Sequence, residues 1–311
     1  MTGNTINTRM GVTEWAMLIG LSILWGGSFF FVEIALREWP PLSIVAARVV
    51  LATVALWAVA LIARWPIPTG ASAWTAFFVL GLTNNVLPFL LITWGQKTVA
   101  SGLAAILNAS APIFTVIVAG VFLRDERIST MKVAGAVLGL AGVAILVGPG
   151  AMGEGASGLL ASVAILGAAL SYAVAGVYAR RLPAMGVNPV VASAGQLLMS
   201  SIIMLALFAV FERPSTLAAT SAGVWAAVVA LAVLSTSFAY ILYFRLIESA
   251  GATNAILVTL LIPVTAILLG WMLLGERLGI AQFAGMAVIA AGLLLIDGRL
   301  PGVVMRARRT R

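Results

Sequence analysis

Long apolar stretches recur along the whole chain, and short segments rich in charges, glycines and prolines separate them. A helix needs about 20 apolar residues to cross about 30 Å of hydrocarbon. Stretches of that kind predict about ten membrane-spanning helices, at residues 15–36, 41–63, 74–94, 102–123, 131–148, 157–179, 189–211, 223–244, 253–274 and 280–297. The connecting segments are too short to hold a second domain. The pattern therefore predicts an all-α integral membrane protein in which residues 1–311 form one membrane domain.

The chain also contains the same unit twice. Pro112 is followed by Glu126-Arg127 and a glycine-rich span, and Pro263 is followed by Glu276-Arg277 and a second glycine-rich span. This repetition indicates a duplication, with halves 1–149 and 150–311. Each half holds about five spans, an odd number, so the second half must cross the membrane in the opposite sense. Inverted repeats around a central cavity are typical of carriers that work by alternating access.

Composition agrees with a bilayer environment. Hydrophobic residues make up 62% of the chain and charged residues 9%, and the mean hydropathy is +1.12. Such a chain has too few polar side chains to cover a soluble core. Enzymes that depend on histidine or cysteine are excluded because the chain has neither residue, and no ATP-binding Gly-rich motif with a Lys is present. We therefore expect no enzyme, no metal site and no cofactor.

The positive charges predict the orientation, because loops rich in Lys and Arg stay in the cytoplasm. With the N-terminus inside, 13 of the 18 basic residues fall on the inner side, 4 fall on the outer side, and Arg48 lies within a span. Both termini are therefore expected in the cytoplasm. This asymmetry explains the net charge of +8 without any nucleic acid, and the basic tail at residues 306–311 is interpreted as an anchor beside anionic membrane lipid.

Three prolines lie near the centres of their spans. A proline has no N–H for the carbonyl four residues before it, so Pro88, Pro112 and Pro263 are expected to act as hinges and to free one backbone acceptor each. The residues whose carbonyls are freed are Asn84, Asn108 and Thr259. All three carry polar side chains on the same helix face as the proline. The sequence therefore predicts a polar cavity halfway across the membrane, lined by spans 74–94, 102–123, 223–244 and 253–274.

Further residues of these spans and of span 15–36 are candidates for the same cavity. The polar candidates are Asn85, Ser235, Ser237 and Tyr240, and the aromatic candidates for its walls are Trp25, Phe29, Phe89, Phe114, Phe238 and Tyr243. Each polar residue has an alternative role as a hydrogen-bonding contact between helices, and each aromatic residue as ordinary packing. With no acid or base at the depth of the three carbonyls, the cavity is expected to bind an amphipathic or zwitterionic solute.

Two charged residues lie within spans. Arg48 is about seven residues from the outer end of span 41–63, and Glu33 is near the outer end of span 15–36. The short turn between these spans brings the two residues side by side, so an ion pair that holds the helices together is the expected role. The alternative is gating or proton coupling.

The residues that carry the repeat resemble a known family. The start of the first span, from Trp25 to Leu36, Arg48, the Ala-rich span with Pro112, and the duplicated Glu-Arg pairs before glycine-rich spans are similar to the EamA family of the drug/metabolite transporter superfamily. That resemblance implies ten helices in two inverted five-helix repeats. Within the family the chain is most similar to the YddG-type exporters of aromatic and other neutral amino acids, which implies an amino-acid exporter of the bacterial inner membrane.

Alternatives to this function remain open from the sequence. A carrier of the same type could move a sugar derivative, a drug or a modified nucleoside, and an enzyme that modifies lipid would belong to a different class. The glycines of spans 131–148 and 280–297 provide smooth helix faces, which suit packing within one bundle or between two copies. The chain is therefore expected to be a monomer or a homodimer.

Overall fold

The protein is described here by a computed structural model of the 311-residue chain. The structure describes residues 10–122, 130–153, 155–212, 220–255 and 257–297. Glu126-Arg127 and the basic tail at residues 306–311 lie outside the described residues. Every regular element in the described ranges is helical, which confirms the all-α prediction.

Seven helical segments in these ranges are long and apolar enough to cross a membrane: Val12–Ala35, Pro41–Ile62, Ala71–Gly95, Ser101–Phe122, Ala156–Met185, Pro189–Phe211 and Ala222–Ala250. Three shorter apolar helices follow the same pattern, at Val133–Ile145, Val258–Leu274 and Ile280–Leu295. Each span expected from the sequence overlaps one of these segments. Many large apolar side chains on their outer faces are exposed, among them Ile62, Val121 and Phe211. Such a surface suits lipid and not water.

Several of these segments are not continuous α-helices. In the first half, α3 (Ala71–Leu80) continues through one π-helical turn, η1 (Gly81–Val86), into α4 (Leu87–Gly95). In the second half, α10 (Ala222–Ala232) passes in the same way through η4 (Val233–Phe238) into α11 (Ala239–Ala250). A second interruption separates α5 (Ser101–Asn108) from α6 (Ala111–Phe122), just before Pro112. Its counterpart region contains α12 (Ala252–Ala255), α13 (Val258–Leu269) and η5 (Gly270–Leu274).

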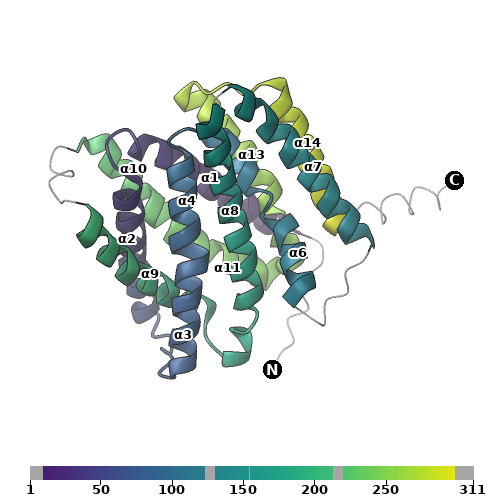
Figure 1. Cartoon of the computed structure of the whole chain (residues 1–311). Coiled ribbons are helices and arrows are strands. Elements are labelled where there is room, and N and C mark those ends of the chain that lie inside the picture. Colours follow the sequence, from purple (N-terminus) through teal and green to yellow (C-terminus); the bar gives the residue numbers. More distant parts are fainter. Residues whose placement is uncertain (1–9, 123–129, 154, 213–219, 256, 298–311) are drawn as a thin grey trace.

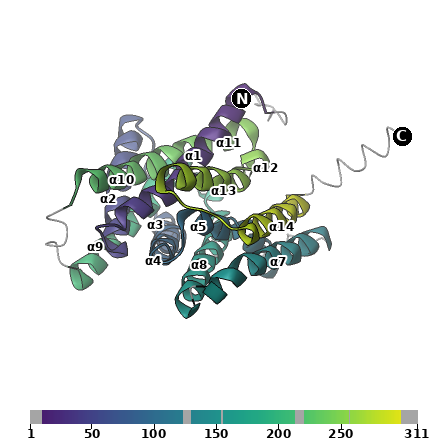
Figure 2. The same cartoon turned by 90° about the horizontal axis from the view of Figure 1, so that it is seen from above.

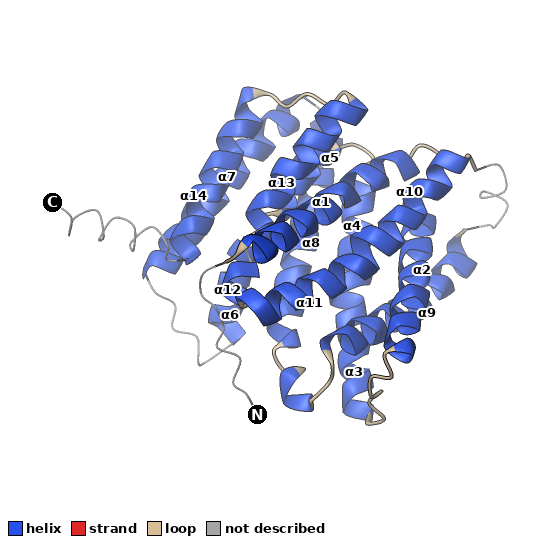
Figure 3. Ribbon diagram, turned by 180° about the vertical axis from the view of Figure 1, so that it is seen from behind, coloured by secondary structure: helices blue, strands red, loops and turns tan. Residues whose placement is uncertain are grey.

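The remaining long helices are α1 (Val12–Ala35), α2 (Pro41–Ile62), α7 (Thr130–Gly153), α8 (Gly155–Ala179), α9 (Pro189–Phe211) and α14 (Ile280–Asp297). At one edge of the bundle, α7 packs along α14 (Figure 1). The group made by α2, α9 and α10 lies at the opposite side (Figure 2). From behind, α1 is seen crossing between α13 and α10–α11 (Figure 3), whereas α8 packs against α4, α5 and α6.

Glycines allow the closest of these contacts. A Cβ atom on Gly142 would come within 2.8 Å of the backbone nitrogen of Ile289, and one on Gly292 within 2.6 Å of the carbonyl oxygen of Gly135. Both would overlap the neighbouring backbone, so α7 and α14 approach as they do because these residues have no side chain. The glycine faces are thus used within the chain. Gly26 plays the same part between α1 and α13, where the Thr265 hydroxyl donates to the carbonyl of Ser22 at 2.7 Å.

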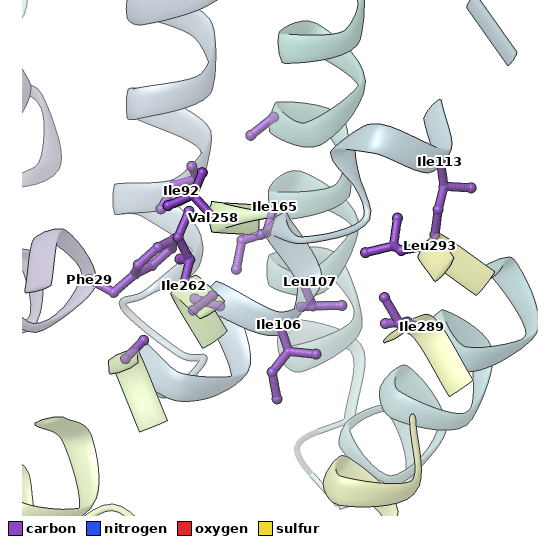
Figure 4. Packing of buried hydrophobic residues seen from close by; sticks show 14 of the residues in the cluster. Phe29, Ile92, Ile106, Leu107, Ile113, Ile165, Val258, Ile262, Ile289 and Leu293 are labelled. Atoms are coloured by element: carbon purple, nitrogen blue, oxygen red, sulfur yellow. The ribbon is translucent and has the colours of Figure 1, made fainter. Parts of the chain in front are cut away.

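The largest buried apolar cluster joins these helices in the middle of the molecule (Figure 4). Phe29 from α1, Ile92 from α4 and Ile262 from α13 form one end of it, and Ile113 and Leu293 belong to the other end. Because the side chains come from both halves, the cluster holds the two halves together by packing. Phe29, Ile92 and Ile262 also line the cavity described next.

Candidate functional site

A cavity of about 750 Å³ lies between the helices of the two halves. Its walls are formed by α1, α2, α4 and η1 of the first half, and by α8, α9, η4, α11 and α13 of the second, with the end of α5 contributing Asn108. Nine residues predicted for the cavity line it: Trp25, Phe29, Asn84, Phe89, Asn108, Ser235, Tyr240, Tyr243 and Thr259. Arg48, which was predicted to pair with Glu33, lines it as well. The predicted carbonyl-bearing residues Asn84, Asn108 and Thr259 therefore share one space and do not face lipid.

Asn84 and Tyr240 are part of a hydrogen-bonded cluster in the cavity wall. The Asn84 amide nitrogen donates to Gln196 Oε1 at 3.1 Å and to the Tyr240 hydroxyl at 3.3 Å. Tyr240 in turn donates to Asn85 Oδ1 at 3.2 Å. The cluster joins η1, α9 and α11, so it fixes polar groups from both halves at one wall of the cavity.

Asn85 and Ser237 do not line the cavity, in contrast to the prediction. Asn85 is 0% exposed, and its amide nitrogen donates to the Ser200 hydroxyl at 3.1 Å. Ser237 donates to the carbonyls of Ala232 at 3.0 Å and Ala52 at 3.3 Å. Both side chains are used between helices, because their positions on the π-helical turns point them at α9 and α2. This is the alternative role that the sequence left open.

The prolines themselves lie outside the cavity lining, and a serine hydroxyl contacts the backbone beside Pro88. Hydrogen bonds in a π-helical turn join residue i to residue i−5. Pro88 directly follows such a turn and has no N–H, so it donates neither to the carbonyl of Asn84, four residues before it, nor to that of Thr83, five residues before it. The Ser171 hydroxyl donates to the Thr83 carbonyl at 2.6 Å. Pro112 begins α6 just after the interruption, whereas Pro263 lies inside α13.

Arg48 has a different environment from the one predicted. Its Nε donates to the Thr236 hydroxyl at 3.0 Å, and its guanidinium carbon lies 3.6 Å from the centre of the Phe89 ring. In the described ranges no ion pair joins Arg48 and Glu33. The ion-pair prediction is wrong because the guanidinium turns inward to η4 and α4, where a hydroxyl and an aromatic face receive it.

Glu33 belongs to another cluster. It lies beside Gln96 and close enough to Glu276 for their charges to interact. The carboxylate of Glu276 accepts the backbone N–H of Ser101 at 2.9 Å and of Gly102 at 3.1 Å. Glu276 therefore caps the first turn of α5, although 175 and 174 residues separate it from those two partners. The region after η5 in the second half is in this way tied to a helix of the first.

Aromatic side chains form the apolar part of the cavity wall. The rings of Trp25 and Tyr243 pack with their centroids 5.3 Å apart, and Phe29 lies in the same wall. Two other predicted wall residues are placed elsewhere. Phe238 is 50% exposed on the outside of η4, and Phe114 is not among the lining residues.

The cavity contains one charged residue among its described lining residues, Arg48. This corrects the expectation that the site has no fixed charge. Among the described residues, no three Asp or Glu side chains lie close enough together to hold a metal ion. The lining residues that the sequence argument missed include Gln96, Tyr172 and Gln196. Tyr172 and Gln196 are polar residues within the apolar spans 157–179 and 189–211, and a polar residue in an apolar span is the signal that marks such positions in a sequence.

Comparisons with known proteins agree with this arrangement. The sequence profile of the EamA-like transporter family matches residues 13–148 and 159–297. YoaV, an uncharacterised transporter of Bacillus subtilis (strain 168), is 24% identical over 278 residues, which cover 89% of this chain and 94% of that protein. YedA, an uncharacterised inner membrane transporter of Escherichia coli (strain K12), is 28% identical over 281 residues, which cover 90% and 89%.

A plant protein and a solved structure extend the likeness. A chloroplastic WAT1-related protein of Arabidopsis thaliana is 25% identical over 290 residues, which cover 91% of this chain and 69% of that protein. A solved crystal structure that is 21% identical aligns with a TM-score of 0.64 over 97% of this chain and 100% of that chain, so the fold is shared along the chain. Because the two segments matched by the family profile cover well over half of the sequence, the chain belongs to the EamA-like transporter family.

Proposed function

We propose that the protein is a secondary carrier that exports neutral, especially aromatic, amino acids or similar small metabolites across the bacterial inner membrane, without direct use of ATP. The observation that carries this proposal is the cavity of about 750 Å³ between helices of both halves. Sites for small molecules typically have volumes of about 300–1,000 Å³ and apolar walls with a few well-placed polar groups. The aromatic wall and the amide cluster give the cavity that character.

The pairing of helices supports alternating access. With halves 1–149 and 150–311, α2 packs against its repeat equivalent α9, and α7 against its equivalent α14. The contact of α1 with α10 and α11 has its counterpart in the contact of α8 with α3 and α4. The contact of α1 with α13 likewise corresponds to that of α8 with α5 and α6. A two-fold axis between the halves produces such an exchange, and ten crossings in two inverted sets of five let the halves trade shapes.

The chemistry of the walls favours an amphipathic solute. Trp25, Phe29 and Tyr243 offer aromatic faces to an apolar side chain, whereas Asn84 and Gln196 present amides. An aromatic amino acid combines both requirements, with a flat apolar ring and a polar backbone end. The partners expected are the solute and membrane lipid, with no nucleic acid. A monomer is favoured over a homodimer, because α7 and α14 use their glycine faces on each other.

The excess of basic residues on one side favours cytoplasmic termini. An inner-membrane location follows from the same topology and agrees with the name given to the YedA relative. Export, as opposed to uptake, is inferred from the resemblance to amino-acid exporters.

Reconstituted liposomes test the proposal. Purified protein in vesicles loaded with radiolabelled tryptophan, phenylalanine or leucine should release the label faster than protein-free vesicles. Asn84→Ala should slow this release, with Thr75→Ala as the matched control because Thr75 is exposed and bonds only within its own helix. If no neutral amino acid moves while a sugar derivative or nucleoside does, the substrate class is wrong. Chemical conversion of a solute without its movement across the membrane would overturn the carrier proposal as a whole.

A further inference from the structure

Arg48 is a buried positive charge in an apolar span and is only 9% exposed. Its contacts account for one of its three guanidinium nitrogens, because Nε donates to Thr236. The two terminal nitrogens, Nη1 and Nη2, have no hydrogen-bond partner among the described residues and open onto the cavity. The ring of Phe89 stacks against the face of the guanidinium, so this contact does not cover the edge that carries the terminal nitrogens.

Such a charge is costly when nothing compensates it. Arginine remains charged in proteins, and a buried charge without a counter-ion costs several kcal/mol. The lining residues in the described ranges include no aspartate or glutamate. Glu33, the acidic residue predicted to neutralise Arg48, lies instead with Gln96 and Glu276. Among the described residues, the cation therefore meets only neutral groups, namely a hydroxyl, an aromatic face and the nearby phenols of Tyr172 and Tyr240.

We propose that Arg48 forms an anion subsite in the cavity and binds the carboxylate of the transported solute through its terminal nitrogens. This inference rests on the proposed carrier function and names the group by which the cavity recognises its solute. A carboxylate accepts two parallel hydrogen bonds from a guanidinium, which gives both charge compensation and a fixed orientation. Phe89 and Thr236 hold the guanidinium in place, so little ordering remains to be done when the solute arrives.

The ammonium group of an amino acid has no equivalent charged partner among the described lining residues. An ammonium group in this cavity meets amide oxygens, hydroxyls and aromatic faces, none of which carries a full negative charge. The carboxylate is therefore the more important of the two groups for binding. A solute with a carboxylate and no amine should bind better than a solute with an amine and no carboxylate.

The first experiment uses the wild-type carrier in proteoliposomes. L-Tryptophan flux is measured in competition with indole-3-propionate, which has the carboxylate only, and with tryptamine, which has the amine only. We expect indole-3-propionate to compete at least about tenfold better than tryptamine, the factor that corresponds to about 1.4 kcal/mol. Equal competition by the two compounds, or better competition by tryptamine, would overturn the proposal.

The second experiment changes the cation. Arg48→Gln should raise the half-saturating concentrations of tryptophan and indole-3-propionate by about tenfold or more, while tryptamine binding changes little. Arg48→Lys keeps the charge and should recover part of the loss. Arg245→Gln is the matched control, since Arg245 is exposed on α11 and does not line the cavity. A thermal unfolding curve in detergent accompanies each variant, so that a folding defect is recognised as such.

The outcomes separate this inference from the proposed function. If the wild-type carrier moves tryptophan but Arg48→Gln folds and binds carboxylates as well as the wild type does, the anion subsite is wrong and the carrier proposal stands. If no neutral amino acid is transported while thermal stabilisation by indole-3-propionate depends on Arg48, the amino-acid assignment is wrong and the anion subsite stands.

Discussion

At the scale of single residues, neighbouring positions of the same type have different roles. Asn84 lines the cavity, whereas Asn85 is enclosed between η1, α9 and α11 and makes two hydrogen bonds there. Asn108 resembles neither, because its amide makes no hydrogen bond to a described residue although its Oδ1 is buried. A buried polar group without a partner lowers stability, so its retention fits a group that meets the solute.

Asn108→Ala should therefore reduce transport without reducing stability. No hydrogen bond is lost on replacement, and an unsatisfied buried atom is removed. Asn85→Ala is the matched comparison, because it removes two hydrogen bonds at a fully buried position and should lower the free energy of unfolding by about 1–3 kcal/mol. Flux in proteoliposomes and thermal unfolding in detergent, measured on both variants, check the contrast. A larger stability loss in Asn108→Ala than in Asn85→Ala would contradict it.

The residue types of the site could be read from the sequence, but their partners could not. Asn84, Asn108 and Thr259 were predicted because each lies four residues before a mid-span proline and carries a polar side chain, which is rare in apolar spans. The direction of Arg48 depended on a hydroxyl at Thr236, 188 positions away, and on the ring of Phe89. The short turn between the first two spans places Glu33 near Arg48, but it gives no information about contacts with residues far away in the sequence.

At the scale of elements, the bounds of the helices follow from hydrophobicity, whereas their internal interruptions do not. The length of an apolar stretch can be counted in the sequence, and it determines whether the helix can cross the bilayer. A π-helical turn interrupts the regular backbone hydrogen bonds of the α-helix. It is stable here because neighbouring helices supply donors to its carbonyls. In η1 these are Ser200, which donates to Gly81 at 3.0 Å, and Ser171, which donates to Thr83.

Gly81→Ala should loosen the contact of η1 with α9. An added Cβ would come within 2.7 Å of the Gln196 carbonyl oxygen and 3.1 Å of Met199 Cβ, so α9 must shift. We expect a loss of about 1–3 kcal/mol in the free energy of unfolding, together with slower transport because Gln196 moves with α9. Gly223→Ala is the control, since its Cβ has nothing closer than a hydroxyl oxygen at 3.9 Å. The apparent melting temperature in detergent, measured on both variants, should be lower for Gly81→Ala than for Gly223→Ala. Equal melting temperatures would contradict the expectation.

At the scale of the whole molecule, the cavity exists only because two halves meet. The aromatic wall combines α1 of the first half with α11 of the second, and the amide cluster combines η1 of the first half with α9 and α11 of the second. Neither half encloses the space alone. The repeat in the sequence predicted a shared cavity of this kind. Its volume depends on how closely helices such as α1 and α13 approach each other, which periodicity does not specify. The inward direction of Arg48 depends on Thr236 and Phe89.

Labelling from the two sides of the membrane tests the inverted arrangement. The chain has no cysteine, so single cysteines placed at Lys97 and Glu248, both exposed, report on one position each. Lys97 lies between the third and fourth spans and Glu248 near the end of the eighth, so inverted halves place them on opposite sides. A membrane-impermeant maleimide should label Lys97→Cys in intact spheroplasts and Glu248→Cys only after lysis. Labelling of both in intact spheroplasts would contradict the arrangement.

The contact of Glu276 with the first turn of α5 has a consequence for how the carrier changes shape. Two peptide N–H groups have a carboxylate as their partner only while the region after η5 stays against α5. If these elements separate, the two N–H groups and the Glu276 carboxylate lose their hydrogen bonds, unless water enters between them and solvates both. We therefore expect water to enter this junction whenever α5 and the region after η5 separate, so osmotic stress should slow turnover more than it weakens the affinity for the solute.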